Sequence, residues 1–227
     1  MSSSQAALPS SASAGLLQVW NALALTGQDY EYDPGVDRRG TADVEESLGR
    51  RLPADLAAIY EAANGLYLLH GNLQILPITA EEENWCLPRH TDWLRSVEWT
   101  IPDEVVVFGG NGGDEVFGLW IPRGSDPEKA PVVLISDEDF TDDPGYGLIG
   151  STFTRFFASW TAMYLIITEA NEAALEALGV PNDIQEDDEE ILDRIIAWGD
   201  PTLAGDCHDP NAEGAIPVSV LRSRFAR

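Results

Sequence analysis

Cysteine, cations and long apolar runs are all scarce in this chain of 227 residues. The two cysteines, Cys86 and Cys207, are too few and too far apart for a disulfide framework. No apolar run approaches the roughly 20 residues of a membrane-spanning helix. The serine-rich start has neither the cationic nor the apolar part of a secretory signal. We therefore expect a soluble, cytoplasmic protein without a membrane span.

Positive charge is outweighed threefold, with 13 Lys and Arg against 39 Asp and Glu and a net charge of −26. Nucleic acid is a poor partner for such a chain, because binding it relies on Lys and Arg that neutralise phosphates. The same repulsion disfavours an anionic membrane surface. A basic protein is the natural electrostatic complement, and the field would mainly speed association. The alternative is that the charge serves solubility alone.

Signatures of catalysis and of metal binding are also missing. The glycines of 109–113 fit neither a P-loop nor G-x-G-x-x-G, and a hairpin turn explains them. No G-x-S-x-G motif is present. Cys86 with His90 and Cys207 with His208 offer ligand pairs, but a zinc site needs about four ligands in compact spacing. We expect no enzymatic activity, no metal, no cofactor, and ordinary surface histidines.

Hydrophobic periodicity predicts both helices and strands. Helices are expected at 15–25, 41–49, 52–65, 151–167, 171–178 and 191–198, with part of 81–98 helical. Thr41 and Ser151 are the expected N-caps, and Asn64 with Gly65 the expected left-handed stop of the 52–65 helix. Strands are expected at 73–78, 105–108, 115–121 and 131–135, with a further one at 216–220.

This pattern predicts an α+β fold with a mostly antiparallel sheet of about four to six strands, wrapped by helices. Residues 1–14 are expected to form a disordered tail, because serine and alanine dominate them. Residues 15–167 would form the main domain. Residues 168–227 would form a helical C-terminal extension and tail.

An acidic segment between the last predicted sheet strand and the helix at 151–167 is the candidate partner-binding site. It contains Asp137, Glu138, Asp139, Phe140, Asp142 and Asp143. Five carboxylates within seven residues repel one another, and Phe140 offers an apolar anchor. Loops on a rigid scaffold commonly carry function. The alternatives are a solvated loop or calcium ligation, although the EF-hand spacing is absent.

A second acidic run, 186–190, precedes the helix at 191–198. Carboxylates are favourable at a helix N-terminus, so this run has a structural explanation as well as a partner-facing one. From Asp137 to Glu190 there are 14 acidic residues and one cation, Arg155. The charge is therefore unevenly distributed along the chain.

Trp85, Trp93 and Trp99 lie close together in the sequence, with a spacing that fits neither helix nor strand. Each one is expected to belong to the core. An exposed tryptophan beside an acidic loop would instead be a binding hot spot, because tryptophan is enriched at such positions.

The order and spacing of several short motifs resemble the SUKH superfamily. The motifs are Val44 to Gly49, Leu52-Pro53 with Asp55-Leu56, Tyr60, Asn64-Gly65, Gly113-Asp114, Pro131 to Val133, and Ser151-x-Phe153-x-x-Phe156-Phe157. The resemblance covers roughly residues 16–167. It departs from the family pattern at Leu66, where a second glycine is usual.

The resemblance implies an α+β fold, a mostly antiparallel sheet and no enzymatic activity. Bacterial members of the superfamily are immunity proteins that bind and block toxin domains, often nucleases or deaminases. Such toxins would be basic, so the resemblance and the charge imply the same kind of partner. The alternative implied by fungal members is a regulatory scaffold unrelated to any toxin.

Overall fold

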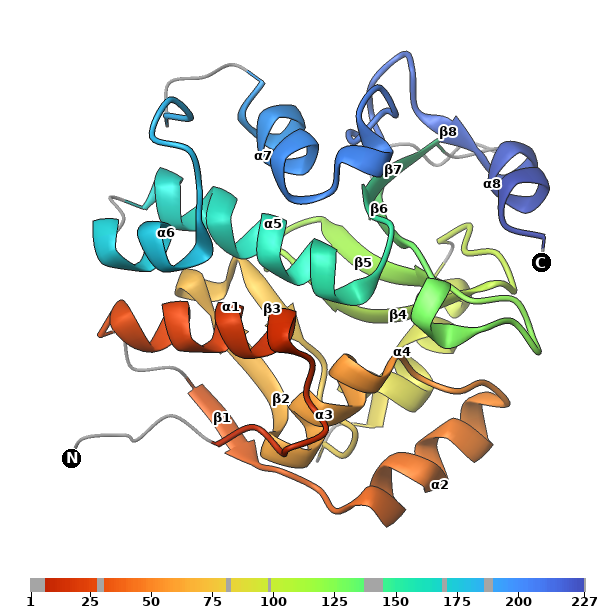
Figure 1. Cartoon of the computed structure of the whole chain (residues 1–227). Coiled ribbons are helices and arrows are strands. Elements are labelled where there is room, and N and C mark those ends of the chain that lie inside the picture. The colour runs from red at the N-terminus through yellow and green to blue at the C-terminus, as the bar shows by residue number, and fades with distance from the viewer. Residues whose placement is uncertain are drawn as a thin grey trace.

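The computed structural model describes residues 7–27, 31–80, 83–97, 99–136, 145–168, 171–185 and 190–226 (Figure 1). In chain order the elements are α1 (Ala14–Leu25), β1 (Glu31–Pro34), α2 (Arg38–Leu48), α3 (Ala54–Ala62), β2 (Ala63–Leu68), η1 (Leu69–Gly71), β3 (Leu73–Ile75), η2 (Glu83–Trp85), α4 (Leu87–Ser96), β4 (Val105–Gly110), β5 (Glu115–Trp120), η3 (Pro127–Lys129), β6 (Val132–Ser136), β7 (Gly145–Gly150), α5 (Phe153–Ile167), α6 (Glu172–Leu178), α7 (Ile191–Gly199), η4 (Pro201–Leu203), β8 (Ile216–Pro217) and α8 (Val218–Arg224).

The strands form an antiparallel sheet in which β1 to β7 follow one another in chain order, and the short β8 pairs with β7. This confirms the α+β class, with more strands than the four to six expected. Strand β7 was not expected, because its sequence GYGLIG is rich in glycine, which disfavours strands. The packing explains these glycines. A Cβ on Gly147 would lie 2.0 Å from the His208 carbonyl oxygen, so a side chain cannot fit there.

Helix α5 packs its aromatic stripe on one face of the sheet. The Phe156 ring lies 4.9 Å from that of Phe117 in β5 and 5.6 Å from that of Phe108 in β4, measured between centroids. The Trp160 ring stacks edge-on against Phe117 at 4.8 Å. Helices α1, α6 and α7 flank α5 and extend this layer (Figure 1). The period of 3.6 residues predicted this helix correctly, because each apolar position faces the same sheet.

Two residues expected to end α3 belong to the sheet instead. The helix ends at Ala62, and Ala63 is already extended, with φ of −150°, as the first residue of β2. Gly65 has φ of +88° within that strand and lies against the backbone of Pro77, where a Cβ would come within 2.9 Å. The Asn64 side chain accepts a hydrogen bond of 2.8 Å from the Ile78 amide. These residues therefore join β2 to the segment after β3, and the predicted C-cap was wrong.

The predicted caps of two other helices shift by a few residues. Helix α2 begins at Arg38, and its N-cap is Asp37, which accepts a 3.0 Å hydrogen bond from the Gly40 amide. Thr41 is therefore buried inside the helix. The N-cap of α5 is Thr152, while the Ser151 amide donates to Asp200 at 2.5 Å.

The elements that follow α5 pack against those that precede it. Helix α6 lies against α1, where the Gln18 side chain donates to the Ala177 carbonyl at 2.9 Å, and α7 lies against α5. Leu178, Ile195 and Leu221 are buried in the same core as the sheet. The expected strand at 216–220 is only the two residues of β8, and α8 follows it directly. Within the described ranges, no helix is long and apolar enough to cross a membrane.

Candidate protein-binding surface

A cavity of about 310 Å³ brings three tryptophans together with the β4–β5 hairpin. We call it the tryptophan groove. Its lining includes Trp85, His90, Trp93, Trp99, Gly109, Gly110 and Val116, with Asp114 and Glu115 from the hairpin. It therefore combines aromatic rings with two carboxylates.

Local contacts of α4 place the tryptophans. Pro88 lies in the first turn of the helix, where a missing N–H costs nothing. The Val107 amide donates to the Thr91 hydroxyl at 2.9 Å and fixes α4 against β4. Arg95 donates to the carbonyls of Ile101 (3.0 Å) and Pro102 (2.7 Å), so the chain after the helix is held close to its last turn. Trp85 precedes this helix, Trp93 is on it and Trp99 follows it.

The rings of Trp85, His90 and Trp93 form a cluster. Their centroids are 5.2 Å apart for Trp85 and His90, 5.3 Å for His90 and Trp93, and 5.7 Å for Trp85 and Trp93. Trp85 is 49% exposed, so the expectation that it belongs to the core was wrong. Trp93 and Trp99 pack against the core but remain partly exposed.

His90 is a buried member of this cluster. Its Nδ1 lies 2.8 Å from the Asn84 carbonyl oxygen. Burial lowers the pKa of His90, and the hydrogen bond to Asn84 offsets this only in part. His208 is buried as well, with Nδ1 2.6 Å from the Leu148 carbonyl, whereas His70 is exposed. The expectation of ordinary surface histidines was therefore wrong for two of the three.

The hairpin supplies the other wall of the groove, on the sheet face away from α5. Phe117 faces α5, and Val116 faces the opposite side because successive side chains of a strand alternate. Asn111 organises the turn: its Oδ1 accepts from the Gly113 amide at 2.9 Å, and its Nδ2 donates to a Glu115 carboxylate oxygen at 2.6 Å. The predicted hairpin is confirmed, and its acidic groups are held at the groove.

A second hollow of about 580 Å³ adjoins the groove, since Gln74, Leu76 and Trp85 line both. Strands β1 and β2 contribute Tyr32, Asp33 and Tyr67 to it. Tyr67 is 45% exposed. We call the two hollows together the aromatic surface. Contiguous exposed aromatic residues of this kind mark interaction sites.

The candidate acidic segment lies outside the described residues. This holds for all six of its proposed contact residues, namely Asp137, Glu138, Asp139, Phe140, Asp142 and Asp143. The structure describes its two flanking residues. Ser136, at the end of β6, pairs with Glu115 of the tryptophan groove. Gly145, at the start of β7, pairs with Pro217. The segment therefore leaves the sheet beside a carboxylate of the groove.

The second acidic run is described only at Glu190, which precedes α7 and makes no side-chain cap. Within the described part of the chain, no three His, Cys, Asp or Glu residues are grouped so that they could hold a metal ion. Neither Cys86 nor Cys207 forms a disulfide within the described part of the chain.

An antiparallel sheet under a helical layer, with an aromatic hollow on its other face, defines an α+β protein with a surface suited to binding. The model of the SMI1 / KNR4 family (SUKH-1) matches residues 36–159, more than half of the chain. The chain therefore belongs to this family, as the sequence resemblance indicated. The match contains the whole tryptophan groove. No curated protein matches the chain.

Proposed function

We propose that this chain is a non-enzymatic immunity protein that binds and neutralises a cognate polymorphic toxin, a nuclease or a deaminase, in the cytoplasm. SUKH domains include proteins of the immunity type, which gives the class. The observation that carries the proposal is the aromatic surface bordered by carboxylates, in a chain with net charge −26.

The chemistry of this surface favours a basic polypeptide segment. Trp85 and Tyr67 are about half exposed, and aromatic rings attract Lys and Arg through cation–π contacts. Asp114 and Glu115 are positioned to pair with the same cations. The acidic segment 137–143 would extend this field, because Ser136 pairs with Glu115 at its start. We propose Asp137, Glu138, Asp139, Asp142 and Asp143 as steering charges and Phe140 as an anchor.

Inhibition would follow from occlusion of the toxin's substrate site. A nuclease needs Lys and Arg to hold phosphates, so an acidic protein that covers these cations blocks the substrate. No covalent step, metal or cofactor is required. One copy of the chain would neutralise one toxin for as long as the complex lasts.

The test is reconstitution with the product of the neighbouring gene. The two purified proteins are mixed, and complex formation is measured by titration calorimetry together with the toxicity of the partner in cells. We expect a complex of one to one, and rescue of growth by this chain. A Trp85→Ala, Trp93→Ala double variant should bind more weakly, whereas Leu25→Ala, an equally exposed apolar position on α1, should not.

Binding without toxicity of the partner would overturn the immunity function and favour a regulatory scaffold. If the groove variant and a variant with the five acids neutralised both still rescue growth, the proposed immunity function stands. The proposed binding surface is then contradicted. Absence of any complex with the neighbouring product would contradict the proposal as a whole.

A further inference from the structure

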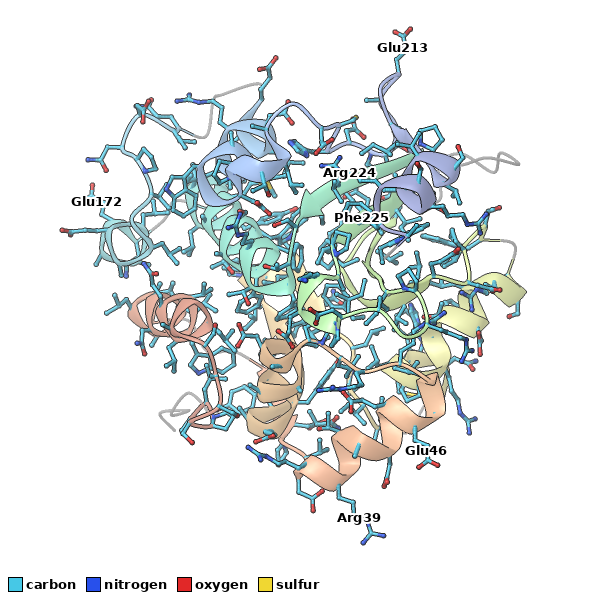
Figure 2. All side chains as sticks on the ribbon, turned by 45° about the vertical axis from the view of Figure 1, so that its right-hand side comes forward. Arg39, Glu46, Glu172, Glu213, Arg224 and Phe225 are labelled. Carbon is cyan, nitrogen blue, oxygen red and sulfur yellow. The ribbon has the colours of Figure 1, made fainter. Side chains whose placement is uncertain are left out.

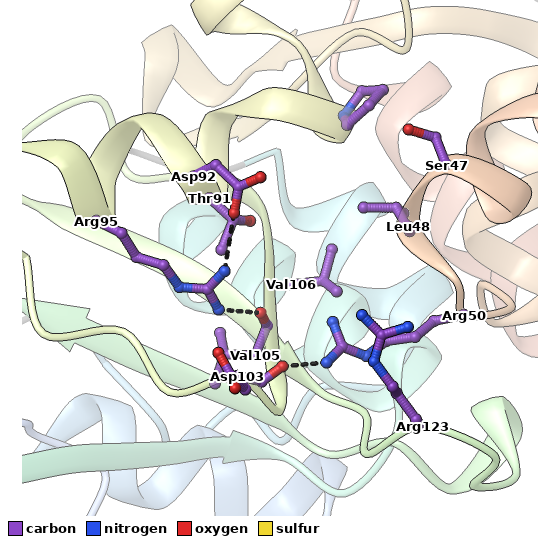
Figure 3. A pocket seen from close by; sticks show the side chains of 11 residues that line it. Ser47, Leu48, Arg50, Thr91, Asp92, Arg95, Asp103, Val105, Val106 and Arg123 are labelled. Atoms are coloured by element: carbon purple, nitrogen blue, oxygen red, sulfur yellow. Dashed lines mark hydrogen bonds and ion pairs between the residues drawn. The ribbon is translucent and has the colours of Figure 1, made fainter.

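Three arginines of this acidic chain line one cavity beside α4, separate from the tryptophan groove. Arg50 follows α2, Arg95 lies in the last turn of α4, and Arg123 follows β5 (Figure 3). The cavity has a volume of about 210 Å³, and its other polar lining residues are Ser47, Thr91, Asp92 and Asp103 (Figure 3). We call it the arginine pocket. It shares no residue with the tryptophan groove, which α4 lines with His90 and Trp93 instead.

Two of these guanidinium groups, those of Arg50 and Arg123, form no ion pair with another residue that the structure describes. Ion pairs between described residues engage seven of the chain's 13 cations, namely Arg38, Arg95, Lys129, Arg155, Arg194, Arg222 and Arg224. Arg95 pairs with Asp92 at 2.9 Å and is otherwise committed to backbone carbonyls. Arg50 and Arg123 have no such carboxylate partner within the described residues.

Few of their N–H donors are engaged by described residues. Arg50 donates through one Nη to the Asp103 carbonyl, but its Nε is buried without a hydrogen-bond partner. Arg123 makes no hydrogen bond to another described residue. Its guanidinium lies over Gly49, where a Cβ would come within 2.5 Å of Nη1. The end of α2 attracts both cations, yet neither side chain hydrogen-bonds a carbonyl of that helix.

The arginines of the pocket repel one another. Burial lowers the pKa of Arg50, and the nearby charges of Arg123 and Arg95 lower it further, against a smaller opposite effect of Asp103 and Glu104. An anion between Arg50 and Arg123 would offset this repulsion. The hydroxyl of Thr91 accepts from the Val107 amide and retains its own hydrogen for donation.

We propose that the arginine pocket binds a small phosphate-bearing anion, either inorganic phosphate or the phosphate group of a small phosphomonoester. The planar fork of a guanidinium matches two oxygens of a phosphate, and two forks from Arg50 and Arg123 provide the charge to hold a dianion. The cavity volume of about 210 Å³ is sufficient to admit a phosphate group. The site does not depend on the proposed toxin binding.

The test uses the purified full chain at constant ionic strength. Inorganic phosphate, glycerol 3-phosphate and acetate are titrated separately, with sodium chloride as the reference. Binding is followed by ³¹P line broadening for the two phosphates and by melting temperature for all anions. We expect saturable binding of at least one phosphate and a rise in melting temperature that chloride and acetate do not give. The compound that binds more tightly shows whether the site prefers inorganic phosphate or a phosphomonoester.

The matched variants are Arg123→Gln and Arg51→Gln. Both remove one charge from an exposed position, but only Arg123 lines the pocket. Loss of a charged hydrogen bond should weaken phosphate binding about tenfold or more in Arg123→Gln and leave Arg51→Gln unchanged. Equal weakening in both variants would show a general charge effect and overturn the site. Phosphate behaviour indistinguishable from chloride would overturn it as well.

Discussion

Arg155 of α5 and Asp200 form an ion pair with 2.6 Å between Nη1 and Oδ1, although 45 residues separate them in the sequence. The Asp200 side chain is fully buried, and it also accepts from the Ser151 amide (2.5 Å) and the Thr202 hydroxyl (2.6 Å). Asp200 lies beyond the residues that the family model matches. Arg155 lies within the match, in the first turn of α5. The Asp200 carboxylate is thus one of the contacts that hold the C-terminal segment on the family core.

Asp200→Asn should destabilise the protein, because the amide loses the charge that holds Arg155 and accepts only part of these hydrogen bonds. We expect a loss of about 2 kcal/mol in unfolding free energy, less than for a fully buried pair because Arg155 is 42% exposed. This corresponds to a fall in melting temperature of about 6 °C, measured by calorimetry. Asp183→Asn breaks an exposed ion pair with Arg194 and should cost about 0.5 kcal/mol or less.

The same carboxylate makes stability depend on pH at the acidic end. Burial raises the pKa of Asp200, but the hydrogen bonds from Thr202, Ser151 and Arg155 outweigh it and hold the pKa below its ordinary value. The unfolded state therefore binds the proton more readily, so the stabilisation is present above about pH 4 and is lost as pH falls through the folded pKa. Wild type should lose more stability than Asp200→Asn between pH 5 and pH 3 in urea titrations. Equal losses would contradict this role.

His90 should give a second pH dependence nearer neutrality. Its pKa is lowered by burial, so the unfolded state binds the proton more readily, and stability should fall as pH drops below about 6.5. In His90→Gln the difference between urea midpoints at pH 7.5 and pH 5.5 should shrink. His70→Asn serves as the control, because His70 is exposed and has a positive φ that asparagine tolerates. If the pH dependence of stability shrinks in His70→Asn and not in His90→Gln, the assignment to His90 is contradicted.

Trp85→Ala should separate binding from folding. Trp85 is 49% exposed, so its truncation should cost little stability but about 2 kcal/mol or more of partner binding if it is an anchor. The measurement pairs calorimetric titration of the partner with a thermal melt of the free variant. Trp160→Ala is the opposite control: it removes a buried ring whose Nε1 donates to the Asn72 carbonyl at 2.8 Å, and should cost about 3 kcal/mol or more of stability.

Neutralisation of the acidic segment should act on association rather than dissociation. With Asp137, Glu138, Asp139, Asp142 and Asp143 changed to Asn or Gln, the rate of association with a basic partner should fall and its salt dependence should flatten. Stopped-flow kinetics at several salt concentrations measures both.

The matched control removes five charges elsewhere, at Asp43, Glu46, Glu172, Glu176 and Glu213. Figure 2 shows Glu46, Glu172 and Glu213 projecting outward from separate parts of the molecule. If this control slows association as much as the segment variant does, net charge rather than the segment steers the partner.

Elements with local signals were predictable from the sequence. Helix α5 was found from its apolar repeat, and α6 was predicted at 171–178, one residue longer than the helix Glu172–Leu178 in the structure. The β4–β5 hairpin was found from two apolar runs around glycines. The family was indicated by the spacing of short motifs. In the helices and the hairpin, residues within about 15 positions interact with one another, so periodicity and turn chemistry record the structure.

Elements that depend on distant partners were missed. Strand β7 tolerates its glycines because Gly147 lies against the backbone of His208, and nothing within the strand indicates this contact. Asn64 and Gly65 have the composition of a helix stop, yet their hydrogen bonds and close contacts are made with the segment after β3. Local propensity was overridden by sheet pairing in both places.

The sequence by itself determined the fold class, the family and the strong negative charge, because composition and short-range spacing carry this information. Only the tertiary structure decided which side chains meet. The three tryptophans were visible as a cluster in the sequence, but their groove exists because α4 lies against β4 and turns them toward Asp114 and Glu115. The arginine pocket and the Arg155–Asp200 pair join residues more than 40 positions apart, and such contacts are set by packing of the whole chain.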